Sequence, residues 1–436
     1  MTLNILFLCN KPKFGNDANT IIDHINAFET YSKHKIWIYS NLGEMSKKLD
    51  LERFDAIIIH YSICLLHDYY LSKKSKERLR EYKGLKIVFV QDEYRQINKM
   101  IAELAFLQID ILFTCFPTSE YDRIYSEDKL PGVKKCNNLT GYIPERLMKL
   151  TEQPLIVKRS IHVGYRGRKI PFWLGELSYE KYSIAERWIE KTSKSDLKTD
   201  ISCEEKDRIY GEKWIEFLSS CKATLGVESG ASVMDFTGNL EKVIDLHQLT
   251  HPNDSFFTVQ KKYLLDHEGL YKLNQISPRC FEAIALKTVL VLYEGEYSGI
   301  LIPWRHYIPL KKDFSNIDDI IIKLHDDLYL QSIADKAFEE IAQNPKYSYR
   351  SFIKSVDQTI EDEFLMRCKQ KVNIPYKIDV YTHDIKYIPF KSKLYQKGLT
   401  CYQKFPLTIR LVIKGVLRPK FAIRYLFKHF FSIVRP

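Results

Sequence analysis

The first 116 residues alternate short apolar runs with charged segments, and this pattern constrains the fold more than any other feature. The apolar runs, in chain order, are "LNILFLCN", "KIWIYS", "FDAIIIHYS", "LKIVFVQDEY" and "IDILFTCF". Continuous runs of this kind are typical of strands buried on both faces, and helix-compatible segments between them imply parallel pairing. The sequence therefore predicts an α/β domain in which helices cover both faces of a doubly wound, Rossmann-like sheet.

A second series of strand and helix signals follows a linker that we expect at Thr151 to Pro154. Its expected strands lie in "RSIHVGYRGR", "KTDIS", "ATLGVES", residues 288–292 and "HYIPL". Because 436 residues are many for a single core, we predict two domains that face each other across a cleft. The predicted parts are a first Rossmann-like domain at 1–152, a second at 153–345, a closing helix at 346–372 and a basic tail at 373–436.

The net charge of +11 is concentrated at the C-terminal end of the chain. After Asp384 the sequence contains twelve Lys and Arg residues and no acid. Removing those twelve from the 66 bases of the chain leaves 54 bases against 55 acids. A body with almost no net charge argues against a nucleic-acid partner, and the tail is expected to carry the basic interaction.

Within the tail, residues 405–436 place basic side chains at helical spacing beside apolar ones. Arg410, Lys414 and Arg418 form one series of i, i+4 and i+8 positions, and a second series follows Pro419. This pattern is typical of a helix that lies on an anionic membrane surface. Two packing helices with solvated basic faces are the alternative interpretation.

The remaining composition favours a cytoplasmic protein. The N-terminal residues "MTLNILFLCN" lack the basic region and cleavage site of a signal peptide, and we expect them to form a strand. Nine cysteines are scattered without metal-like spacing, as is usual in a reducing compartment. We therefore expect no structural metal and no disulfide framework.

The segment "ISPRCFEAIALKTVLVLYEG" predicts a turn, an amphipathic helix and a buried strand. Ser277 is the expected N-cap, and Pro278 suits the first helical position because its missing N–H is not needed there. Glu282 lies within the first apolar turn, although a capping box would need its acid at Cys280. The carboxylate is interpreted either as a surface group beside the core face or as a ligand-binding group.

Several polar and glycine residues follow predicted strands of the second domain. In a doubly wound sheet, ligands bind beyond the carboxyl ends of the strands. Glycines allow a close backbone approach, guanidiniums suit phosphates, and a helix N-terminus attracts anions. We therefore predict a diphosphate site there, with Glu282 bound to the ribose of the nucleotide. The alternatives are that the glycine and arginine loop is a turn with surface salt bridges and that Glu228 is a neighbour of a helix N-cap. The other candidate donor-binding residues are Gly164, Arg166, Arg168, Glu228, Ser229, Ser277 and Arg279.

The segment "SPRCFEAIALKTVLVLYEGEYSGILIPWRHYIPLKKDFSNIDDII" resembles the nucleotide-binding end of GT-B glycosyltransferases. It is similar in particular to the group that shares a domain with a spore-maturation glycosyltransferase, in which Pro-Arg-x-Phe-Glu-Ala precedes a hydrophobic strand. The later "YRSFIKSVDQTI" resembles the closing helix of that group. The resemblance covers about Ile161 to Glu363 and implies a sugar transferase of the GT-B fold.

Carried over by position, Glu282 matches the second Glu of a motif with two Glu separated by seven residues. That second Glu binds the ribose in many retaining members. The first Glu of that motif is Asn274 here, and a His-Asp pair of the first domain is Gln91 and Asp92. Arg166 or Arg168 matches the diphosphate-binding Arg. The resemblance makes Asp92 the catalytic candidate near the acceptor, with a structural role as the alternative.

Further candidates on the acceptor side are Asn16 and Asp17 in the first loop and His60 after a strand, although a lone His there is usually structural. The chain contains no Asp-x-Asp, so arginines and a helix N-terminus are expected to replace a metal at the leaving group.

The expected function is metal-independent transfer from a nucleotide-diphosphate sugar, without other cofactor, to a glycan or lipid-linked acceptor of a surface polysaccharide. The expected location is the inner face of the cell membrane. A polyol-phosphate transferase and a catalytically inactive sugar-nucleotide or glycan-binding protein are the alternatives.

Overall fold

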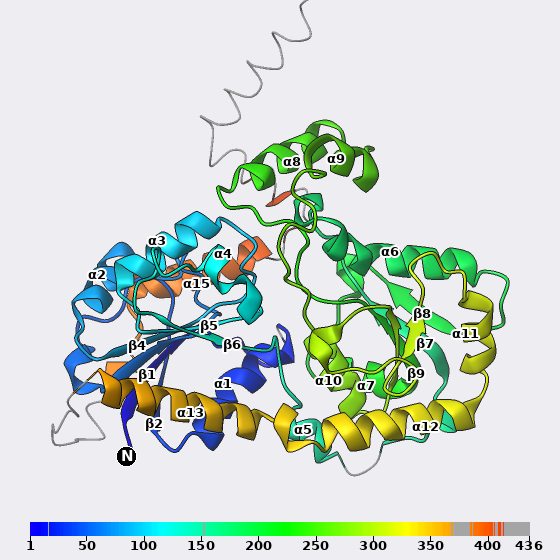
Figure 1. Ribbon diagram of the computed structural model, residues 1–436, viewed down its shortest axis with the longest axis horizontal. Helices are drawn as coiled ribbons and strands as arrows, with labels where there is room; N and C mark the ends of the chain where they lie inside the picture. Colours follow the sequence, from blue (N-terminus) through cyan, green and yellow to red (C-terminus); the bar gives the residue numbers. More distant parts are fainter. Residues whose placement is uncertain are drawn as a thin grey trace, which may run out of the picture.

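The computed structural model describes residues 1–15, 17–150, 153–367, 369, 384–385, 387–403, 405, 409–410 and 413. It contains two parallel sheets, each in its own α/β domain, joined side by side (Figure 1). The predicted pair of doubly wound Rossmann-like domains is therefore confirmed. Asn16 and nearly all of residues 405–436, the amphipathic part of the predicted tail, lie outside the described residues.

The first sheet has six parallel strands in the order β2-β1-β3-β4-β5-β6. Its strands are β1 Asn4–Cys9, β2 Lys35–Ser40, β3 Ala56–Ile59, β4 Leu85–Phe89, β5 Ile111–Thr114 and β6 Lys134–Asn137. Alternate side chains of the central strands enter two separate apolar clusters, one on each face. The helices of this domain are α1 Asn19–Tyr31, α2 Lys73–Glu81, α3 Ile97–Leu107, α4 Tyr121–Ile124 and α5 Glu145–Met148.

The second sheet has five parallel strands in the order β11-β10-β9-β7-β8. Its strands are β7 Ile161–Arg166, β8 Thr199–Ser202, β9 Cys221–Gly226, β10 Val289–Tyr293 and β11 Ile308–Leu310. Helices α7 and α10 cover one face, and α6, α11 and α12 cover the other. These helices are α6 Glu176–Lys191, α7 Glu212–Ser220, α10 Pro278–Ala285, α11 Ile317–Leu324 and α12 Asp327–Ala337.

An insertion between β9 and α10 was not predicted by the sequence pattern. Its helices α8 (Asn239–Thr250) and α9 (Phe256–Tyr263) project above both domains in Figure 1. Ile244 and Phe256 of these helices are buried in the same apolar cluster as side chains of α2 and α3. The insertion therefore ties the second domain to the core of the first.

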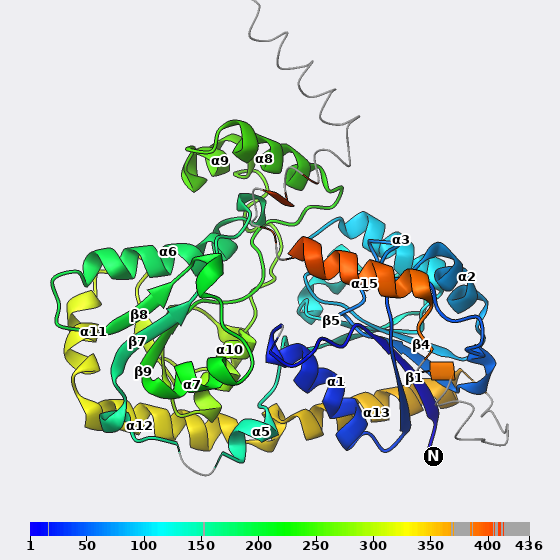
Figure 2. The same cartoon turned by 180° about the vertical axis from the view of Figure 1, so that it is seen from behind.

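The last long helix of the core, α13 (Tyr349–Met366), returns from the second domain to the first (Figure 2). It buries Phe352, Ile353 and Ile360 against the sheet face that α1 also covers. Ser348 caps its N-terminus by accepting a hydrogen bond from the Ser351 N–H at 3.1 Å. A further helix, α15 (Phe390–Gln403), lies on the α2–α3 side of the first domain (Figure 2). Of the helices described, none has the length and apolar character needed to span a membrane.

Candidate functional site

Loops that follow strands of the two sheets meet at the junction of the domains. Asn19, after β1, donates a hydrogen bond to the Gly211 carbonyl of the second domain at 3.3 Å. After β4, the backbone of Tyr94 and Ile97 pairs with that of Asp235, at 2.8 and 3.3 Å. The junction thus brings together the polar residues that follow β1 and β4 and those of the second sheet, as expected for a ligand site of doubly wound domains.

Three cations of the second domain gather at this junction. Arg168 follows β7, Arg279 is the second residue of α10, and both side chains are exposed. Lys181 on α6 is partly buried. The pKa of the Lys181 ammonium is lowered to about 8, mainly by burial and in part by the positive charges of Arg168 and Arg279, against the opposing effect of Asp92 of the first domain. This group of positive charges is suited to a phosphate anion.

Lys181 is the site residue that the sequence did not reveal. It occupies an ordinary position of an amphipathic helix, thirteen residues beyond Arg168 along the chain. Only packing of α6 against the second sheet brings it toward Arg168 and Arg279. One feature of the sequence could have identified Lys181 as a site residue. It lies in the first two turns of the helix that follows the predicted phosphate loop.

Arg166 and Gly164, also predicted to bind the donor, have local partners in this structure. The Arg166 guanidinium lies 2.8 Å from an Asp200 carboxylate oxygen and 4.3 Å from the centre of the Phe217 ring. A Cβ on Gly164 would lie 2.3 Å from Cys221 Sγ, so packing accounts for this glycine. Of the two arginines that match the family position, Arg168 is the one left open to a ligand.

Glu228 and Ser229 lie after β9 in a loop whose polar groups are largely satisfied. Glu228 accepts hydrogen bonds from the Tyr297 N–H and from the Asn274 amide, both at 2.8 Å. Ser229 pairs through its backbone with Gln275, with N···O distances of 2.7 and 2.9 Å. Asn274, which stands where the family motif has its first Glu, therefore donates a hydrogen bond to a carboxylate supplied by the loop after β9.

Substitution of Gly230 in the same loop is expected to be strongly destabilising. Its φ is +108°, and a Cβ would lie 1.7 Å from the Leu273 carbonyl oxygen. We expect Gly230→Ala to lower the free energy of unfolding by about 3 kcal/mol or more. Gly132 also has positive φ but open space around it, so Gly132→Ala should lose only about 1 kcal/mol. Equal losses in urea unfolding of the two variants would contradict this explanation.

The start of α10 lies against the loop between β6 and α5 of the first domain. Ser277 is the N-cap and Pro278 the first helical residue, as predicted, although the Ser277 side chain makes no capping bond. The Thr140 hydroxyl donates to the Ile276 carbonyl at 2.5 Å. A Cβ on Gly141 would lie 3.1 Å from Pro278. The helix N-terminus that carries Arg279 is therefore held at the domain junction.

Glu282 is neither an exposed surface group nor a freely accessible ligand. Its side chain is buried, so the surface interpretation is wrong. The Trp214 indole N–H donates to Glu282 Oε2 at 2.9 Å, and Arg146 Nη2 lies 4.0 Å from Oε1. Arg146 in turn binds Asp23 on α1 through two bonds of 2.8 and 2.9 Å. Burial raises the pKa of Glu282, against the lowering effect of Trp214 and Arg146. The carboxylate thus belongs to a charged bridge between the domains, and contact with a ribose remains a prediction.

Asp92 has an exposed side chain and a left-handed backbone, with φ of +55°. The next residue, Glu93, is buried and accepts hydrogen bonds from Thr114 and Tyr125 hydroxyls at 2.5 Å and from the Cys115 N–H at 2.7 Å. Burial raises the pKa of Glu93 to about 7. Glu93 therefore anchors the turn that presents Asp92 toward Lys181.

Two of the acceptor-side candidates can be placed. Asp17 lies near Arg208 and Tyr210 of the second domain; burial raises the pKa of Tyr210, and the Asp17 carboxylate adds to that rise. His60 is fully buried, with Nε2 3.0 Å from His24 Nδ1 and Nδ1 2.8 Å from Ser62 Oγ. An acceptor cannot reach this imidazole in the structure, so His60 serves the core and the prediction that it lines the acceptor side is wrong.

The buried pair of His24 and His60 is expected to make the protein sensitive to mild acid. Burial lowers the pKa of His24 to about 3 and places that of His60 well below its usual range. The unfolded chain takes up protons below about pH 6.5 that the folded pair refuses. Stability should therefore fall as pH decreases from 6.5, by about 1.4 kcal/mol per pH unit for each histidine. Urea unfolding at pH 7, 6 and 5 should show a smaller fall in the His24→Phe/His60→Leu variant; an identical fall would contradict the assignment.

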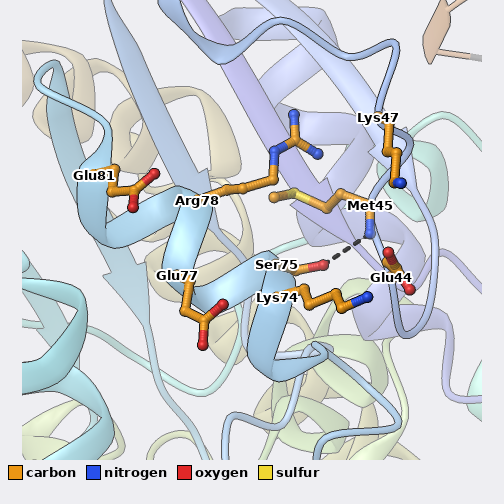
Figure 3. Close-up of a pocket in the computed structure, with 8 residues that line it drawn as sticks. All are labelled: Glu44, Met45, Lys47, Lys74, Ser75, Glu77, Arg78 and Glu81. Atoms are coloured by element: carbon orange, nitrogen blue, oxygen red, sulfur yellow. Dashed lines mark hydrogen bonds between the residues drawn. The ribbon is translucent and has the colours of Figure 1, made fainter.

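Within the described part of the chain, no cluster of three or more His, Cys, Asp or Glu side chains could hold a metal ion. A surface hollow in the first domain lies between α2 and the loop after β2, and Figure 3 shows the mixed charges that line it. None of the predicted site residues is among those lining residues. The candidate site is therefore the domain junction around Asp92, Arg168, Lys181 and Arg279.

Comparison with known proteins gave no family model that matches the chain and no curated protein that matches it. Several solved structures are similar in fold. An alpha-glucosyltransferase in complex with UDP-glucose and DNA containing an abasic site shares 12% identity, covers 83% of this chain and 100% of its own, and has a TM-score of 0.49. Anabaena HepE in complex with UDP-glucose shares 10%, covers 83% and 100%, and has a TM-score of 0.44. T4 phage BGT in complex with its UDP-glucose substrate shares 10%, covers 85% and 99%, and has a TM-score of 0.41. At such levels of similarity, the function has to be inferred from the side chains of this chain.

Proposed function

We propose that this protein is a glycosyltransferase that uses a nucleoside-diphosphate sugar. The observation that supports this most is the group of Arg168, Lys181 and Arg279 at the domain junction, opposite Asp92. A departing nucleoside diphosphate develops negative charge, and positioned cations beside a helix N-terminus stabilise that charge. The donor therefore binds the second domain, with its diphosphate on these three side chains.

In this proposal Asp92 acts on the acceptor from the first domain. An acceptor hydroxyl between the domains attacks the anomeric carbon, and the bond between that carbon and the phosphate oxygen breaks. Asp92 takes the hydroxyl proton, while the electron pair of the broken bond leaves on the diphosphate. Glu93 is buried and accepts hydrogen bonds within the first domain, which leaves Asp92 as the exposed carboxylate of this turn.

The acceptor that we propose is a glycan or lipid-linked glycan of a surface polysaccharide, at the inner face of the cell membrane. Asp17 and Asp92 would repel the phosphates of a nucleic acid, and the chain before residue 385 is nearly neutral. The twelve bases after Asp384 suit anionic lipid headgroups instead.

The donor site is tested by thermal stabilisation with UDP, GDP, CDP and ADP. A ligand at about one hundred times its Kd should raise the Tm by about 3 °C. We expect one nucleotide to do so with the natural chain and to lose the effect in Arg168→Ala/Arg279→Ala. Lys261→Ala, an exposed basic residue on α9, is the matched control and should keep the effect. Stabilisation by none of the four nucleotides would refute the proposed donor site.

Turnover separates the transferase from its alternatives. Release of nucleoside diphosphate from a panel of sugar nucleotides, with and without EDTA, should occur with the natural chain and should persist in EDTA. Asp92→Asn should bind the same nucleotide but release it at least about 100-fold more slowly. Binding without release from any donor would identify a binding protein, and release of a cytidine nucleotide from a polyol donor would identify the polyol-phosphate transferase.

A further inference from the structure

Helix α15 is attached to the first domain at its beginning, and Tyr402 near its end lies close to Tyr69 of that domain. The Ser392 hydroxyl donates to the Glu44 carbonyl at 3.2 Å, and Lys48 lies 5.3 Å from the centre of the Tyr387 ring just before the helix. Glu44 also lines the hollow of Figure 3, so the helix begins beside that part of the surface. At the other end, the Tyr402 hydroxyl contributes to raising the pKa of Tyr69, mainly caused by burial.

The outward face of α15 is apolar and basic. Phe390 is 80% exposed and Leu394 60% exposed, which is far beyond what a helix packed on both sides would show. Lys393 and Lys397 are exposed on the same stretch of the helix. These four positions follow the i, i+3, i+4 and i+7 spacing of one helical face.

The charge around this face restricts its partner. Neither α15 nor the sequence after it contains an acid, whereas both contain bases. A neutral apolar partner would gain nothing from the lysines, and a basic partner would be repelled. Exposed Phe and Leu beside Lys are the combination that inserts into the headgroup region of an anionic bilayer.

We infer that the outward face of α15, made of Phe390, Lys393, Leu394 and Lys397, docks on an anionic lipid surface. This inference extends the proposed function, because it places the membrane contact on a helix attached to the first domain and not only on residues 405–436. Tyr69 lies in the loop after β3, at the carboxyl edge of the first sheet. Lipid bound along α15 is thus held beside the edge that carries Asp92, where a lipid-linked acceptor has to enter.

Flotation with vesicles tests the docking face on the full chain. With phosphatidylglycerol vesicles, we expect Phe390→Ser/Leu394→Ser to lower the partition coefficient by about tenfold or more, because two apolar side chains no longer enter the bilayer. Lys393→Glu/Lys397→Glu should lower it by a similar factor and weaken its dependence on salt. Leu328→Ser removes an 86% exposed leucine of α12 and should leave partitioning unchanged.

Two outcomes would overturn the inference. Unchanged partitioning of both double variants would show that residues 405–436 act without α15. Self-association without vesicles, abolished by Phe390→Ser/Leu394→Ser, would show that the face binds a second copy of the chain. Nucleotide-dependent Tm shifts measured on the same variants should equal those of the natural chain. If the natural chain and every variant showed no nucleotide-dependent Tm shift, the proposed donor site would be wrong. That outcome would leave the inference on the docking face untouched.

Discussion

Replacing Lys181 by methionine is expected to weaken the binding of the donor's nucleoside diphosphate by about 10- to 100-fold. A hydrogen bond between charged groups contributes about 1.5–3 kcal/mol, and methionine keeps the apolar stem of the side chain while removing its charge. Titration calorimetry with the nucleotide that raises the Tm measures the change. Lys169→Met is the matched control, because Lys169 is an exposed lysine of the neighbouring loop, and its effect should stay below about threefold.

The pH dependence of nucleotide affinity distinguishes loss of the positive charge of Lys181 from a packing defect. Because the pKa of Lys181 is lowered to about 8, the ammonium loses its proton as pH rises through that value. Affinity for the anion should be full near pH 7 and should fall toward pH 9, by at most about tenfold per pH unit for one proton. Lys181→Arg keeps its charge throughout this range and should remove the fall. A natural chain whose affinity is constant from pH 7 to 9 would exclude Lys181 from the anion site.

Much of the fold could be predicted because the strands are buried on both faces. Ala56–Ile59 and Val289–Tyr293 are continuous apolar runs, and the structure buries every residue of both. Pro278 was also predictable at the start of α10, since proline is suited to the first helical position. The helices α8 and α9 could not be placed in the same way, because their buried side chains complete a cluster that begins in the other domain.

The candidate site was less predictable, because its groups come together only through tertiary packing. Arg168 and Arg279 follow a strand and start a helix, so the rule on carboxyl ends of strands identified them. The sequence pattern predicts a ligand-binding or surface group at Glu282, whose partner Trp214 is 68 residues away in the sequence. A local pattern cannot show whether a charged residue in an apolar turn meets a partner from another element. The burial of Glu282 could therefore be established only from the three-dimensional structure.

The bridge between the domains leads to the second large effect: Arg146→Met should lower the free energy of unfolding by about 2–4 kcal/mol. Loss of this guanidinium leaves the carboxylates of Asp23 and Glu282, both largely buried, without their shared cation. Lys272→Met, which breaks the exposed pair with Glu296, should lose less than about 1 kcal/mol. Urea unfolding compares the two variants under the same conditions.

A double-mutant cycle and its pH dependence distinguish this bridge from simple loss of packing. Glu282→Gln removes one of the two charges, so Arg146→Met/Glu282→Gln should be more stable than the sum of the single losses predicts, by about 1–3 kcal/mol. Burial already raises the pKa of Glu282, and loss of Arg146 should raise it further. An acid whose pKa is higher in the folded state than in the unfolded chain binds its proton more readily in the folded state. Protonation of Glu282 therefore adds to the free energy of unfolding as pH falls toward about 4.3, the pKa of a Glu in the unfolded chain. The loss in Arg146→Met should consequently be smaller at pH 5 than at pH 7, whereas a packing defect would give the same loss at both.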